Sequence, residues 1–101
     1  MKMLLKVVFP NESFNSLVTN GTAGKNLEKI MGELKPEAAY FTLSEGKRCL
    51  LMVININKPG DYVNYAEPFF LQFNAGIKYD ITMSPEELKA AGLEELGKKY
   101  A

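Results

Sequence analysis

Hydrophobic positions alternate with polar ones in several segments of the chain, as they do in β-strands. This pattern fits residues 2–9, about 38–43 and 77–83, whereas residues 48–57 contain six consecutive apolar side chains from Cys49 to Ile54. Alternation is typical of a strand with one buried face, and a short unbroken apolar run with β-branched residues is typical of a strand apolar on both faces. The sequence therefore predicts four strands, with residues 48–57 the most deeply placed.

Helical periodicity separates these strands. Apolar residues recur at spacings of three and four from Phe14 to Val18, from Leu27 to Leu34 and from Tyr62 to Phe73, which predicts three helices. Pro68 must kink the third helix or start a new one, because proline has no N–H for the helical hydrogen bond. Residues 84–87 (Ser-Pro-Glu-Glu) form a capping box with proline at the first helical position, and this predicts a further helix in the tail.

The predicted order is β-α-β-β-α-β-α, the split βαβ arrangement of ferredoxin-like folds. In that topology the sheet order is 4-1-3-2, so that residues 48–57 form a central strand. We therefore predict an α+β protein with one domain covering residues 1–101, a ferredoxin-like core at 2–83 and a helical tail at 84–101.

Alternation also assigns the strand residues to two faces of the sheet. One face is expected to lie under the helices and includes Phe41, Leu43 and Ile81. The other has an apolar centre and polar edges, which is the anatomy of a protein interface. An apolar patch of that size is unfavourable in water, and the same face of a second copy, related by a two-fold axis, is its simplest cover. The predicted interface residues of this homodimer are Leu4, Lys6, Val8, Leu51 and Val53.

The stretch EGKRCLLMVININKPGDYVNYAEPFFLQFNAGIKYDITMSPEEL combines a hairpin, an aromatic helix and a last strand that ends in an acidic capping box. Together with the predicted βαββαβ topology, this stretch resembles the dimeric α+β barrel superfamily, in which two ferredoxin-like sheets pack face to face. The resemblance covers residues 2–83 and is greatest to small bacterial members of unassigned function. Enzymatic relatives include cofactor-independent monooxygenases and muconolactone isomerase. No catalytic residue carries over, since the His that several relatives use is absent here.

Composition narrows the possible partners. Lys+Arg and Asp+Glu balance at 12 each among 101 residues, so no net charge attracts nucleic acid or an anionic membrane. Residues 47–54 also lack the aromatic side chains on which an RNA-recognition sheet stacks bases. With no His and one Cys the usual zinc and haem ligands are missing, and we expect no metal and no cofactor. No apolar run is long enough to span a membrane, and we expect a cytoplasmic protein.

The aromatic helix is the best candidate for a ligand site. It concentrates large rings beside polar groups, and two interpretations are open: the rings pack against the sheet, or they wall a cleft. The predicted ligand-pocket residues are Tyr62, Tyr65, Glu67, Phe69, Phe70, Phe73 and Asn74. Elsewhere, Lys6, Lys78 and Asp80 share one face of neighbouring strands, where they are either an acid/base pair or exposed cross-strand charges.

Two functions remain open. The first is a non-catalytic homodimeric module that binds a small apolar or aromatic ligand. The alternative is a cofactor-independent enzyme, a monooxygenase or isomerase, that acts on such a metabolite. The absence of a nucleophile–base pair favours the first, and a pocket carboxylate or lysine with a strongly shifted pKa would favour the second.

Overall fold

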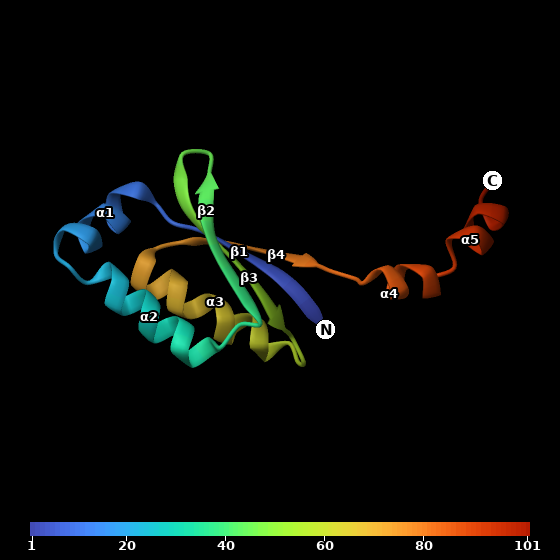
Figure 1. Cartoon of the computed structure of the whole chain (residues 1–101), viewed down its shortest axis with the longest axis horizontal. Coiled ribbons are helices and arrows are strands. Elements are labelled where there is room, and N and C mark those ends of the chain that lie inside the picture. Colours follow the sequence, from blue (N-terminus) through green and yellow to red (C-terminus); the bar gives the residue numbers. More distant parts are fainter.

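The computed structural model describes all 101 residues. A four-stranded antiparallel sheet carries the first three helices of the chain on one side (Figure 1). The elements in chain order are β1 (Lys2–Val8), α1 (Asn11–Thr19), α2 (Ala23–Leu34), β2 (Ala38–Ser44), β3 (Lys47–Asn55), α3 (Gly60–Phe73), β4 (Gly76–Ile81), α4 (Pro85–Ala90) and α5 (Leu93–Lys99). The strand order β2-β3-β1-β4 is the predicted order 4-1-3-2 read backwards, and it is compatible with a ferredoxin-like fold. None of these helices is long and apolar enough to cross a membrane.

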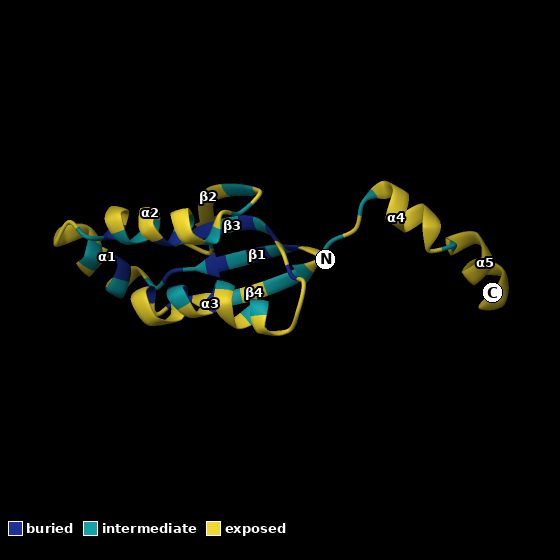
Figure 2. Ribbon diagram, turned by 90° about the horizontal axis from the view of Figure 1, so that it is seen from below, coloured by how far each residue is buried: buried dark blue, intermediate teal, exposed yellow.

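The core lies between the sheet and the helices α1, α2 and α3. In the ladders Leu5 pairs with Met52 on one side and with Tyr79 on the other, which aligns one row of side chains across the sheet. Seen from below, α2 and α3 lie side by side over this face (Figure 2). The buried cluster consists of Met3, Leu5, Val7, Phe9, Phe14, Ala23, Ile30, Leu50, Met52, Ile54, Ile56, Phe69, Phe73 and Ala75.

Phenylalanine rings from α1, from α3 and from Phe9, which follows β1, close the core at one end. The ring of Phe9 lies edge-on to Phe14 at 5.0 Å and to Phe73 at 5.2 Å between centroids, a favourable arrangement for aromatic pairs. α3 continues through Pro68 as one helix. Phe69 and Phe73 are four residues apart, so both rings point from the same face of α3 into the core.

Three residues expected under the helices are exposed instead. Phe41 is 60% and Leu43 71% exposed, because the β2–β3 hairpin extends beyond the helical layer (Figure 1). Ile81 is also exposed, at the last residue of β4, where the chain leaves the sheet. Alternation assigned these residues to the helix side of the sheet, but the helices do not reach over them.

The tail predicted at 84–101 forms an arm that leaves the end of β4 and points away from the rest of the molecule (Figures 1 and 2). It contains α4 and α5, and neither has a buried residue. The predicted capping box is confirmed: Ser84 Oγ accepts from the Glu87 N–H at 3.0 Å, and Glu87 Oε1 accepts from the Ser84 N–H at 2.9 Å. These hydrogen bonds hold the pKa of Glu87 below its ordinary value. Gly92, with φ of 76°, makes the left-handed bend between the two helices.

We expect Phe69→Ala to lower the free energy of unfolding by roughly 3–5 kcal/mol, the usual cost of deleting a buried ring. Phe69 is 0% exposed, whereas its neighbour Phe70 is 43% exposed. The matched variant Phe70→Ala should therefore cost much less. Urea unfolding followed by circular dichroism measures both values. Equal losses at the two positions would contradict this placement of α3.

Candidate functional site

The helix-free face of the sheet carries the five predicted interface residues. Leu4, Val8, Leu51 and Val53 are partly buried, and the ladder pairs Leu4 with Val53 and Lys6 with Leu51. Cys49 lies on the same face opposite Val8 and is buried. The centre of this face is therefore apolar, with Lys6 as its one charged residue.

Polar side chains border one end of the face. Glu37 Oε2 lies 3.0 Å from Lys2 Nζ, and Glu37 Oε1 accepts a hydrogen bond from Asn55 Nδ2 at 2.8 Å. The hydrogen bond from Lys2, followed by that from Asn55, holds the pKa of Glu37 below its ordinary value. All three side chains are exposed, so the ion pair contributes little to stability. This end of the face is therefore polar and charged.

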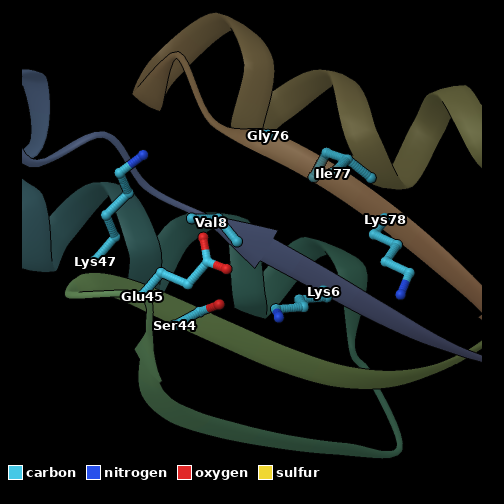
Figure 3. Close-up of a pocket in the computed structure, with 8 residues that line it drawn as sticks. All are labelled: Lys6, Val8, Ser44, Glu45, Lys47, Gly76, Ile77 and Lys78. Carbon is cyan, nitrogen blue, oxygen red and sulfur yellow. The ribbon is translucent and has the colours of Figure 1, made fainter.

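The opposite end contains a hollow with a volume of about 320 Å³ (Figure 3). We call it the lysine hollow. Its walls come from β1, from the start of β4 and from the turn between β2 and β3. The lining residues are Lys6, Val8, Ser44, Glu45, Lys47, Gly76, Ile77 and Lys78.

Positive charge dominates the lysine hollow, with three lysines against Glu45. Lys6 lies directly opposite Lys78 in the β1–β4 ladder, and like charges in that position repel each other. Lys78 Nζ is 3.7 Å from Asp80 Oδ1, but Lys6 forms no ion pair. A small anion bound between these ammonium groups would relieve the repulsion, and the Ser44 hydroxyl could donate a hydrogen bond to it.

The predicted ligand-pocket residues are divided among several places. Phe69 and Phe73 are in the hydrophobic core, and Tyr65 packs against it. Asn74 is exposed at the C-terminal end of α3, with φ of 53°. The other three border a groove of about 300 Å³ between α3 and β4, which is lined by Tyr62, Val63, Ala66, Glu67, Phe70, Ile77 and Tyr79.

Two tyrosines fix one wall of this groove. The Tyr79 hydroxyl donates to the backbone carbonyl of Tyr62 at 2.6 Å, and the two rings meet edge-on at 4.8 Å. The Tyr62 hydroxyl in turn donates to Met3 Sδ at 3.3 Å. Burial, with smaller effects from Tyr62 and Tyr65, raises the pKa of Tyr79 to about 12. The Tyr79 phenol is therefore a neutral structural donor at ordinary pH.

Sequence reasoning did not identify Ser44, Glu45 and Lys47 as possible site residues. The signal for Lys6 and Lys78 was present, because alternation places both on the helix-free face. The signal for Lys47 was present too, because it precedes Cys49 by two residues in β3 and so lies on the same face. Only Glu45, in the turn with Gly46, lies outside the strand pattern. No group of three or more His, Cys, Asp and Glu side chains could hold a metal ion.

Comparison of the sequence with protein-family models gives no match, and no curated protein matches it.

We expect the wild type to lose stability more steeply than Tyr79→Phe between pH 10 and pH 12. The pKa of Tyr79 is raised from 10.0 to about 12 in the folded state, so the unfolded chain gives up this proton first. The contribution of the protonated Tyr79 phenol to the free energy of unfolding is complete below pH 10 and is lost as the pH rises through 12. Urea unfolding at each pH measures the difference. Parallel curves for the two proteins would show that the phenol does not hold its proton preferentially in the folded state.

Proposed function

We propose that this chain is a homodimeric module of the dimeric α+β barrel type that binds a small ligand between its two copies. The helix-free faces pack against each other, and the lysine hollow takes the acidic group of a ligand with an apolar or aromatic body. The position of Lys6 carries the proposal, because it is a charged residue without an ionic partner at the centre of an apolar face.

The dimer is supported by the distribution of side chains on the helix-free face. Leu4, Val8, Leu51 and Val53 retain partial exposure although they occupy the central strands. The ion-paired Lys2 and Glu37 border one end, and Glu45 and Lys47 at the β2–β3 turn border the other. Stacked sheets pack about 10 Å apart, so a second copy of this face would remove the apolar centre from water and leave the polar ends at the rim.

The ligand is supported by the cost of enclosing Lys6. A charged group that loses water is strongly unfavourable unless it is paired and hydrogen-bonded. A carboxylate, sulfonate or phosphate on the ligand would supply that partner. The aliphatic stem of Lys6 and the side chain of Val8 offer apolar contact to the rest of the ligand.

Binding is favoured over catalysis by where the pKa shifts occur. They lie at Glu37, Tyr79 and Glu87, and each of these groups forms a hydrogen bond that serves the fold. None of the three lines the lysine hollow. Tyr79 lines the α3–β4 groove, but its hydroxyl donates to the Tyr62 carbonyl and its raised pKa keeps the phenol protonated, so it is not a base at ordinary pH. The enzymatic alternative would need a carboxylate or lysine with a strongly shifted pKa within a pocket.

We expect the wild type to be a dimer of about twice the 11.3 kDa chain mass in light scattering at micromolar concentration. Leu51→Asp should give monomer, because it places an unpaired charge in the middle of the interface. The control is Leu71→Asp, which makes the same change at a 77% exposed position on α3. A monomeric wild type would contradict the proposed dimer.

We expect Lys6→Gln to weaken binding of a fluorescent naphthalene sulfonate, which combines an aromatic body with an anionic group. Loss of a charge-assisted hydrogen bond of about 1.5–3 kcal/mol corresponds to roughly a tenfold or greater rise in Kd. Lys25→Gln, on the exposed surface of α2, is the matched control. Unchanged affinity in Lys6→Gln, with reduced affinity in Phe70→Ala, would move the ligand to the α3–β4 groove.

A further inference from the structure

The sheet has two free edges, and one of them carries no charge. In the order β2-β3-β1-β4 the outer strands are β2 and β4. β4 contains Lys78 and Asp80, which form an ion pair at 3.7 Å. β2 has the sequence AAYFTLS, and its ladder with β3 runs from Ala38 to Ser44 without a bulge. Charges, prolines and bulges are the devices that keep an exposed edge from pairing with another chain, and β2 has none of them.

The outer side of β2 presents backbone groups that no other strand contacts. Val53 faces β2, because its carbonyl oxygen accepts from the Glu37 N–H at 2.9 Å. The ladder partner of Val53 is Ala38, so Ala38 and every second residue after it direct their N–H and C=O groups toward β3. The residues between them direct theirs outward, and these are Ala39, Phe41 and Leu43.

Large side chains accompany these free backbone groups. Tyr40, Phe41 and Leu43 are each more than half exposed. Phe41 and Leu43 lie on the helix side of the sheet, beyond the reach of the helices, and Tyr40 lies on the other side. The edge is therefore apolar on both faces of the sheet, and such an edge is a template for strand pairing.

The carboxylates at the two ends of β2 are directed away from its free edge. Glu37 is held by Lys2 of β1 at 3.0 Å and by Asn55 of β3 at 2.8 Å. The Glu45 side chain lies over the lysine hollow, which it lines together with Val8 of β1 (Figure 3). Both groups therefore point toward the inner strands, and neither protects the edge.

We propose that β2 pairs with β2 of a second copy across a two-fold axis, so that two four-stranded sheets become one continuous sheet. The axis is perpendicular to the sheet and passes between the two Phe41 residues. It makes the two strands antiparallel, keeps the helices of both copies on the same side and forms every contact twice. The contact uses the edge and not the helix-free face, so it does not depend on the homodimer proposed above.

The side chains of β2 are complementary to themselves in this register. Phe41 faces Phe41, and the outward backbone groups of these two residues bond to each other. Tyr40 faces Thr42 on the opposite side of the sheet. Aromatic pairs and pairs of an aromatic with a β-branched residue stabilise antiparallel strands. Nothing but a second copy of the strand is needed to satisfy the edge, which is why we assign a second copy to it.

The same register joins the uncovered end of one β2 to the covered end of the other. Leu43 is exposed near the turn, whereas Ala39 is half-buried and packs against the core. The two-fold axis places Leu43 of each copy opposite Ala39 of the other, a large side chain beside a small one. Each exposed leucine thereby extends the core of the other copy.

The contact is small, and its affinity follows from that. An aromatic side chain buries about 150–250 Å², so two aromatic residues and one leucine from each copy bury roughly 800 Å² in total. Stable interfaces bury about 1,200–2,000 Å², and smaller ones are transient. We therefore expect a Kd on the order of 0.1 mM, which leaves the species present at micromolar concentration unchanged.

Sedimentation equilibrium on Leu51→Asp tests the edge by itself, because this variant lacks the face-to-face contact. It should pass from monomer to dimer between about 10 μM and about 1 mM. Adding Phe41→Lys should raise the Kd at least tenfold, because two ammonium groups then face each other. Adding Leu71→Lys, the control at an exposed leucine on α3, should leave the Kd unchanged. Dimerisation that Phe41→Lys does not weaken would place the contact elsewhere and overturn the proposal.

Disulfide trapping in the otherwise native chain tests the register and does not require Leu51→Asp to fold. Hydrogen-bonded partners in an antiparallel pair have Cα atoms about 5.5 Å apart, within the range that a disulfide spans. Phe41→Cys with Cys49→Ala should therefore give a species of twice the 11.3 kDa chain mass on mild oxidation. Leu71→Cys with Cys49→Ala is the control for random collision. A mixture of Ala39→Cys and Leu43→Cys chains should also be trapped, and either chain alone should not.

The two interfaces can fail separately. Trapping of Phe41→Cys no greater than that of Leu71→Cys, with Leu51→Asp monomeric up to about 1 mM, overturns the edge contact and leaves the face-to-face dimer in place. A wild type that is monomeric at micromolar concentration, with Phe41→Cys efficiently trapped, contradicts the face-to-face dimer and supports the edge contact.

Discussion

The fold depends on a central strand that is apolar on both faces. On one face of β3, Leu50, Met52 and Ile54 are buried beneath the helices together with the alternate residues of β1. On the other face Leu51 and Val53 retain partial exposure. The chain forms one helical layer, and a sheet with two apolar faces needs two covering layers. This imbalance is the physical basis for proposing a second copy.

Much of the fold could be predicted from the sequence because its signals are local. Alternation in β1, the apolar run of β3 and the capping box at Ser84 each depend on residues close together in the chain. The extent of the helical layer is not a local property. Phe41 and Leu43 alternate correctly with Tyr40 and Thr42, yet they are exposed because no helix covers this part of β2. Periodicity gives the face on which a residue lies, but it does not show whether another layer covers it.

The candidate site was less predictable, because periodicity does not show which other elements surround a side chain. Lys6, Lys78 and Lys47 all follow from alternation, which places them on the helix-free face. Periodicity does not show that the turn joining β2 and β3 and the start of β4 enclose a hollow around them. For α3, the composition indicated a cluster of aromatic rings. It did not show how the helix is rotated about its own axis, and so which rings face the core. That rotation buries Phe69 and Phe73 and leaves Phe70 at the border of a groove. Composition alone cannot distinguish a ring in the core from a ring beside a pocket.

Two unsatisfied features of the chain underlie the proposed function. The helix-free face lacks a covering layer, and Lys6 lacks an ionic partner. A second copy related by a two-fold axis would supply the first, because it repeats every contact. It would also bring the apolar centre of a second face toward Lys6, where an unpaired charge is unfavourable. An acidic group on the ligand would balance that charge, which is why we assign one to it.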